Sequence, residues 1–181
     1  MIAACSLALG ACGGTAPESR SPGRDLPAYV GRSVELFDDA IEPSAVGFNL
    51  GTTTAPDRDR LLRERAQIGD AVVRARVTTV TSKDQEQGRS WQMGLQTVER
   101  VTGSGPLSPV FTLTIDPRSP AAGIVRAFES RLIGKTFVAF VREFQGAGEQ
   151  RDDPELHFHL AHDGTDEVNA VLAAALQSSA R

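Results

Sequence analysis

Cysteine is almost missing from this chain of 181 residues: its two cysteines, Cys5 and Cys12, both lie in the first dozen positions. The absence of cysteine after Cys12 excludes a disulfide framework, a thiolate zinc site and a cysteine nucleophile from the rest of the chain. No apolar run approaches the roughly 20 residues that a transmembrane helix needs. The length fits one globular domain after the amino-terminal segment.

An excess of positive charge is also missing. The formal net charge is −4 and the pI is about 5.4, with no concentrated run of Lys or Arg. Because duplex-binding proteins usually present a basic face, nucleic acid is not an expected partner. The chain contains no Gly-x-Ser-x-Gly elbow, phosphate loop, dinucleotide fingerprint or His-Glu-x-x-His. These absences favour a protein that is not an enzyme, although a convergent active site stays open because such a site is recognised by geometry.

The first twelve residues carry the strongest signal. Residues 2–11 are apolar or small and uncharged, with the length of a signal-peptide core and too few residues to span a bilayer. The run closes with Leu9-Gly10-Ala11-Cys12, which resembles the lipobox of bacterial lipoproteins. The resemblance implies that residues 1–11 are a signal peptide and that Cys12 becomes the lipidated amino terminus. The alternative interpretation is a small-residue amino terminus with two incidental cysteines.

The flanks of this motif refine the expectation. No Lys or Arg precedes the apolar run, which points to a start upstream of Met1 or to a trimmed chain. In lipoproteins of enteric bacteria, an Asp directly after the lipidated cysteine retains the protein in the inner membrane. This chain has Gly13 at that position, so the resemblance favours the outer membrane. The side of the membrane stays open.

Residues 12–27 form the lipid-attachment cysteine and a predicted flexible tether. After Cys12 this segment holds three prolines, three glycines and almost nothing to bury, so burial cannot offset the entropy of ordering it. Behaving as a coil, it holds the folded part roughly 20 Å from the membrane. Residues 28–181 are then a single globular domain.

The folded part is predicted to be mainly β. Ser33 is a candidate cap for a short helix that carries Val34, Phe37 and Ile41 and stops at Pro43. Another helix starts near Pro56 and ends at Gly69, with Leu61, Leu62, Arg65 and Ile68 on one face. Alternation of apolar and polar residues then predicts five strands, in residues 70–81, 90–101, 110–115, 135–144 and 155–160. A helix over about residues 119–133 separates the third strand from the fourth, and a terminal helix follows Thr165.

This element order resembles the OB-fold, a five-stranded Greek-key barrel with a helix between strands 3 and 4. The sequence of residues 69–77, together with Gly134-Lys135-Thr136-Phe137-Val138, also resembles the netrin-like barrel of tissue inhibitors of metalloproteinases. The resemblance covers about residues 69–161 and implies a small barrel with flanking amino- and carboxy-terminal helices. It does not imply inhibition, because those inhibitors use a free amino-terminal cysteine and are rich in disulfides, whereas Cys12 is expected to be acylated.

All three histidines lie in one short segment, at His157, His159 and His162. On a strand, His157 and His159 point to the same face about 7 Å apart, and two such imidazoles are a common start for a metal site. His162 or a nearby aspartate is then a candidate third ligand. The competing interpretation, which we favour, places Leu156, Phe158 and Leu160 in the core and leaves His157 and His159 on an ordinary solvated face. No cofactor is expected on that interpretation.

Two further groups are candidates for binding. Arg74 and Arg76 share one strand face and resemble the cations of OB-fold ligand faces, although a satisfied surface pair is the favoured interpretation. The acidic group Asp38, Asp39 and Glu42 lacks the spacing of a calcium loop and is interpreted as a polar helix face.

The leading functional hypothesis is a lipid-anchored cell-envelope protein that acts as a non-enzymatic binding or assembly module, with the membrane and another envelope protein as partners. The alternative is a metal-binding protein or metal-dependent hydrolase that uses His157, His159 and His162. A third hypothesis is binding of a small glycan or peptide on the barrel face. The oligomeric state is left open.

Overall fold

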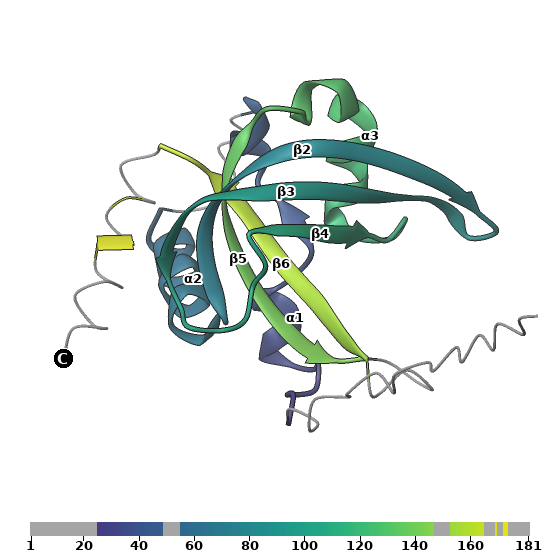
Figure 1. Cartoon of the computed structure of the whole chain (residues 1–181). Coiled ribbons are helices and arrows are strands. Elements are labelled where there is room, and N and C mark those ends of the chain that lie inside the picture. The colour runs from purple at the N-terminus through teal and green to yellow at the C-terminus, as the bar shows by residue number, and fades with distance from the viewer. Residues whose placement is uncertain (1–24, 49–54, 147–152, 165–168, 170–171, 174–181) are drawn as a thin grey trace, which may run out of the picture.

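The computed structural model describes residues 25–48, 55–146, 153–164, 169 and 172–173 of the chain, and Figure 1 shows how their elements are arranged. The helical elements are α1 (Arg32–Leu36), the 3-10 helix η1 (Pro43–Val46), α2 (Ala55–Ile68) and α3 (Pro120–Leu132). The strands are β1 (Ala40–Ile41), β2 (Ala71–Gln85), β3 (Gly88–Thr102), β4 (Val110–Ile115), β5 (Thr136–Gln145) and β6 (Pro154–His162).

The six strands form one mixed sheet in the order β1-β6-β5-β2-β3-β4. All neighbouring strands are antiparallel except β1 and β6, which are parallel. The expected mainly β class is confirmed. The sheet has one strand more than the five expected, because residues 40–41 add β1 at the free edge of β6. Strands β4 and β6 come into contact, but no β-pairing joins them within the described residues, so the sheet is not closed by hydrogen bonds.

The long strands match their predicted positions, and the main difference lies in the β2–β3 hairpin. The alternation predicted one strand that ends at residue 81 and another that begins at residue 90. The two strands instead continue to a tight turn at Glu86–Gln87, with Gln85 paired to Gly88. Polar residues therefore form the end of a projecting two-stranded ribbon, which period and polarity alone cannot distinguish from a loop.

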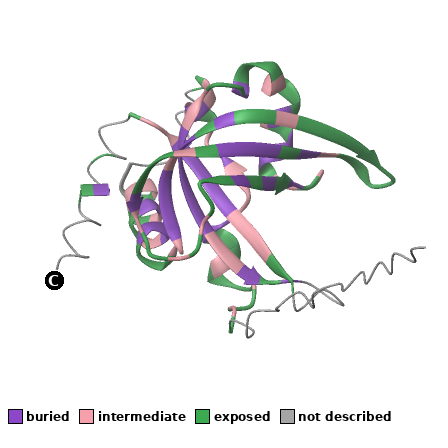
Figure 2. Ribbon diagram, in the orientation of Figure 1, coloured by how far each residue is buried: buried purple, intermediate pink, exposed green. Residues whose placement is uncertain are grey.

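Both faces of the sheet are covered, and Figure 2 shows the buried residues concentrated along its centre. One face, with α3, forms a first core that contains Trp91, Met93, Phe137, Phe158 and Leu160 among others. The other face forms a second core with α1 and α2, made of Leu36, Phe37, Leu62, Val138, Phe140 and Phe144 among others. Consecutive residues of β5 enter opposite cores, which is why this strand reads as a continuous apolar run.

The helices differ from expectation mainly at the amino terminus. Helix α3 begins after Ser119 and ends at Leu132, as predicted. Helix α1 is shorter than predicted and is capped by Gly31, not Ser33. Ile41, expected on the same helix, lies in β1 instead, because Asp39 with its φ of 49° turns the chain toward β6.

The ends of the described chain are fixed to the sheet. The Gln145 backbone N–H donates to the Pro27 carbonyl at 3.0 Å, and Ala28 forms a parallel bridge with Gln145. Leu172 is buried in the second core, while the remainder of the predicted terminal helix lies mostly outside the described residues, as do Cys12 and the tether up to residue 24. Within the described part of the chain, no helix is long and apolar enough to cross a membrane.

Candidate functional site

Strand β6 divides its side chains between the two cores. Phe158 and Leu160 are buried in the first core and Leu156 packs against it, as predicted. His157 and His159 point to the other face of the sheet. The expectation that this face is exposed to solvent is wrong. The His159 residue is only 6% exposed, because α1, α2 and the segment between them cover this face of the sheet.

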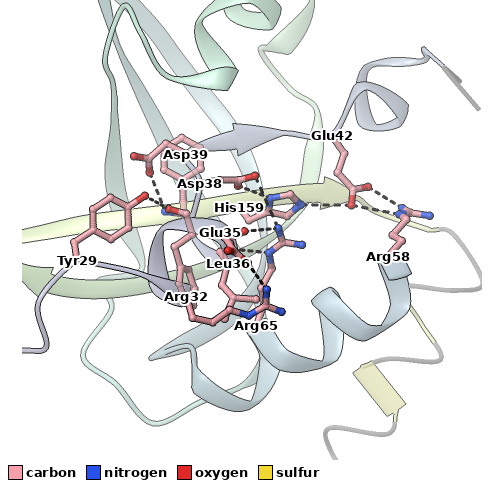
Figure 3. A network of polar contacts seen from close by, with 12 residues as sticks. Tyr29, Arg32, Glu35, Leu36, Asp38, Asp39, Glu42, Arg58, Arg65 and His159 are labelled. Atoms are coloured by element: carbon pink, nitrogen blue, oxygen red, sulfur yellow. Dashed lines mark hydrogen bonds and ion pairs between the residues drawn. The ribbon is translucent and has the colours of Figure 1, made fainter. Parts of the chain in front are cut away.

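Each of these two histidines lies between two carboxylates. His157 Nδ1 is 2.8 Å from Asp39 Oδ2, and its Nε2 is 3.7 Å from Glu155 Oε2. His159 Nδ1 is 2.8 Å from Asp38 Oδ1, and its Nε2 is 3.4 Å from Glu42 Oε1. Both ring nitrogens of His159 are within hydrogen-bond distance of a carboxylate, whereas His157 Nε2 has no hydrogen-bond partner among the described residues. A neutral imidazole has one N–H, so a neutral His159 can donate to only one of its two carboxylates. Figure 3 shows the His159 part of this network.

Asp38 and Asp39 lie in the turn that follows α1. The prediction that they form the polar face of a helix is therefore wrong. Asp39 has a φ of 49°, which is unusual for a residue other than glycine. Its Oδ1 accepts a hydrogen bond from the Phe158 N–H at 3.1 Å, and its own N–H donates to the Phe158 carbonyl at 2.9 Å. Its carbonyl also accepts from the Ala121 N–H of α3. These bonds hold the Asp39 backbone in its strained conformation.

Two arginines of α2 complete the network. Arg65 is only 3% exposed; its Nε donates to the Leu36 carbonyl at 2.5 Å, and its Nη2 is 3.4 Å from the Glu35 carbonyl and 3.9 Å from Asp38 Oδ2. Burial lowers the pKa of Arg65, and the nearby acidic side chains oppose that shift. Arg58 forms an ion pair of 2.7 Å with Glu42.

Tyr29 closes the network on the side of His157. The two rings are stacked, with centroids 3.6 Å apart and an interplanar angle of 13°. The Tyr29 hydroxyl donates to the Phe37 carbonyl. Burial, with smaller contributions from Asp39 and Asp38, raises the pKa of Tyr29 to about 12, so the phenol stays a hydrogen-bond donor at neutral pH.

We call this network the clamp. It consists of the contacts among Tyr29, Asp38, Asp39, Glu42, Arg58, Arg65, His157 and His159. It attaches the amino-terminal segment and α2 to β6. Its histidines and carboxylates bind one another, so the chemistry that the arrangement supports directly is charge pairing across the second core.

Glu42 is the carboxylate on which pH has the clearest effect. Burial acts to raise its pKa, but the hydrogen bonds and charges of His159 and Arg58 outweigh burial and lower the pKa to about 2. The unfolded chain has an ordinary glutamate, whose pKa is near 4.3. The folded state therefore gains stability from ionised Glu42 above pH 4–5, and this stability is lost as the pH falls toward 2.

We expect the substitution Glu42→Gln to flatten the acid limb of the stability curve. Between pH 5 and pH 2.5, the free energy of unfolding of the wild type should fall by about 2 kcal/mol more than that of the variant. Urea denaturation at a series of pH values measures this difference. The control is Glu86→Gln at the exposed hairpin turn, which should follow the wild-type curve. Parallel curves for Glu42→Gln and the wild type would contradict the role of Glu42.

The third histidine does not join the other two. His162 lies on the same face of β6 as Phe158 and Leu160 and is paired with Phe137 of β5. Its Nδ1 is buried with no hydrogen-bond partner among the described residues. In the part of the chain that the structure describes, no group of three His, Cys, Asp or Glu side chains is placed to hold a metal ion.

The two predicted surface cations have different environments. Arg74 pairs with Glu99 at 2.6 Å and Asp163 at 2.9 Å, and it donates to the Asn169 side chain. Arg76 is exposed on the same strand face. Arg74 is thus engaged by the chain itself.

Sequence reasoning missed Tyr29, Arg58 and Arg65. For Arg65 a signal was present, because it stands in the apolar stripe of its helix beside Leu61 and Leu62. A charged residue at such a position indicates a buried polar partner. Nothing local marks Tyr29 or Arg58.

Comparison with protein families and with curated proteins adds no relative to this description. No protein-family model matches the chain, and no curated protein is significantly similar to it in sequence.

Proposed function

We propose that this protein is a lipid-anchored protein of the bacterial cell envelope whose folded part is a non-enzymatic binding or assembly module. The anchor is supported by the lipobox-like residues Leu9-Gly10-Ala11-Cys12 and by the proline- and glycine-rich residues that follow. Gly13 after Cys12 favours the outer membrane. The partners are then the membrane, through the lipid, and another envelope protein.

The folded part of the proposal is an OB-like, partly open barrel. Support comes from the continuous order β6-β5-β2-β3-β4, from the position of α3 between β4 and β5, and from the contact of β4 with β6. OB-folds commonly act as binding modules through strand faces and loops.

The observation that carries the proposal is that the start of the folded part, which follows the proposed anchor and tether, lies at the opposite end of the strands from the projecting hairpin. Pro27 and Ala28 are attached at Gln145, the last residue of β5. Strand β2 pairs with β5 only as far as Arg76 opposite Thr136, the first residue of β5, and then continues to Gln85. Figure 1 shows this hairpin reaching away from the body of the domain. Such an arrangement leaves the hairpin accessible to a partner.

We expect Cys12→Ser to abolish membrane association. In a bacterium that expresses the complete reading frame, the wild type should be recovered in membranes with an intact mass that fits lipidation and cleavage before Cys12. The Cys12→Ser variant should lack the lipid mass and leave the membrane fraction, whereas the Cys5→Ser control should behave as the wild type. An unmodified wild-type product that keeps residues 1–11 would overturn the anchor.

The binding module is tested separately. Chemical crosslinking in intact envelopes should yield a defined complex with another envelope protein. Recovery of the free monomer alone would contradict the assembly role.

A further inference from the structure

The outer half of the β2–β3 hairpin is paired on one side only. Strand β5 ends its pairing with β2 at Arg76, and the last backbone bonds beside it join Val77 to Gly134 and Lys135. Beyond that point, none of the strands in the described part of the chain pairs with the outer edge of β2. The residues from Thr81 to Arg89 are exposed.

The register of the hairpin determines which backbone groups this edge presents. Gln85 and Gly88 flank a two-residue turn and are paired, so they form the hydrogen-bonded pair that closes the hairpin. Hydrogen-bonded and non-hydrogen-bonded pairs alternate along an antiparallel ladder. The N–H and C=O groups of Val80, Ser82 and Asp84 therefore point away from β3, toward the open edge.

This edge is regular and held in shape. The register has irregularities near Val72, Arg74 and Val77 but none from Thr79 to Gln85. At the base of the ribbon Trp91 and Met93 lie in the first core, and Val80 packs against it.

Nearer the tip, cross-strand bonds maintain the ribbon. Arg89 pairs with Asp84 at 2.8 Å, and the Ser90 hydroxyl donates to the Lys83 carbonyl at 3.3 Å. These exposed contacts add to the backbone ladder, which runs without a break to Gln85 opposite Gly88, and the edge is extended in the free chain.

The charge on the edge is set by Lys83. Asp84 is paired with Arg89, whereas Lys83 has no ion pair with any described residue. A strand that adds to this edge gains a charge pair when it places a carboxylate beside Lys83. An open edge with free backbone groups is a template for strand addition, and proteins usually block such edges with proline, a bulge or charged side chains, lysine above all. Between Thr79 and Gln85 there is no proline and no register shift, and the single lysine, Lys83, disfavours a basic strand but can pair with an acidic one.

We propose that the open edge of β2, from Thr79 to Gln85, binds an extended acidic segment of a protein partner by strand addition. This inference rests on the proposed binding function and names the surface and the kind of partner. Backbone hydrogen bonds to Val80, Ser82 and Asp84 supply the affinity, and Lys83 selects an acidic strand.

The test is site-specific photo-crosslinking of the full lipidated protein in native envelopes. A thiol-linked photo-crosslinker is placed at Gln85→Cys on the edge and, for comparison, at Ser130→Cys on the exposed part of α3. The edge position should give an adduct with one protein, and mass spectrometry should locate it in a segment that contains Asp or Glu. The Ser130 position should not give this adduct.

Substitutions at the edge separate strand addition from other contacts. Ser82→Pro removes an outward N–H that β3 does not use, and it should reduce the adduct at least about tenfold. Ser82→Ala keeps that N–H and should leave the adduct unchanged. Lys83→Glu should reduce the adduct several-fold without changing the melting temperature, and it serves as the second variant if Ser82→Pro disturbs folding.

Several outcomes would overturn the inference: no adduct at Gln85→Cys, an adduct only with a second copy of the chain, or an adduct that both Ser82→Pro and Lys83→Glu leave unchanged. A complex that crosslinks elsewhere and persists in both variants would disprove strand addition while leaving the binding function in place. Loss of every complex, with the anchor intact, would count against the binding function itself.

Discussion

Replacing Arg65 by methionine is expected to reduce the free energy of unfolding by about 3 kcal/mol. The guanidinium is buried and donates to the Leu36 carbonyl at the end of α1, with the Glu35 carbonyl and Asp38 close by. Methionine keeps much of the side-chain volume but leaves these acceptors without a donor in the second core. Each lost charged hydrogen bond costs about 1.5–3 kcal/mol. Urea denaturation and the melting temperature, expected to fall by roughly 5–12 °C, measure the effect.

The matched control is Arg63→Met on the same helix. Arg63 is exposed, so its replacement should change stability by less than about 0.5 kcal/mol. Equal effects of the two substitutions would show that Arg65 contributes only helix propensity. A large effect of Arg65→Met alone would establish the clamp as a main link between α2 and the rest of the domain.

Gly103→Ala is expected to cost about 3–4 kcal/mol. Gly103 has a φ of 89°, and a Cβ atom there would lie 2.4 Å from the Asp70 carbonyl oxygen and 2.7 Å from the Ala71 Cα. The positive φ costs an L-residue about 1–2 kcal/mol, and the overlap with backbone adds about 1–3 kcal/mol. Denaturant unfolding of the purified domain measures the sum.

Two other glycines separate these contributions. Gly134 has a φ of 84°, and a Cβ atom there would meet no heavy atom within 4 Å, so Gly134→Ala should cost only about 1–2 kcal/mol. Gly123 lies inside α3 in open space at an ordinary φ, and Gly123→Ala should stabilise the domain by about 0.5–1 kcal/mol. If Gly103→Ala costs no more than Gly134→Ala, the loop after β3 moves away from Asp70 at little cost.

Most of the strands could be predicted from the sequence because their burial is one-sided or complete. In β4 the alternation of Phe111, Leu113 and Ile115 with exposed residues fixed both the element and its inward face. In β5 a continuous apolar run signalled a strand buried on both faces. Strand β1 could not be predicted, because two residues carry no period and their pairing with β6 is a long-range contact.

The clamp was only partly foreseen, for a related reason. His157 and His159 were correctly placed on one face of a strand, and Asp38, Asp39 and Glu42 were correctly noted as a group. Alternation shows which side chains share a face, but it does not show whether another element covers that face. The pairing of residues 38–42 with β6 spans more than a hundred positions of sequence, so no local pattern indicates it.

Strand β5 contributes side chains to both cores, and this limits which substitutions the strand can accept. Phe137, Ala139 and Val141 fill one side while Val138 and Phe140 fill the other. A larger or smaller side chain at any of these positions shifts the backbone that both sides share, because interiors are close-packed. In homologues, substitutions on the side of β5 that faces α3 should therefore be accompanied by compensating changes of side-chain size on the side that faces α2.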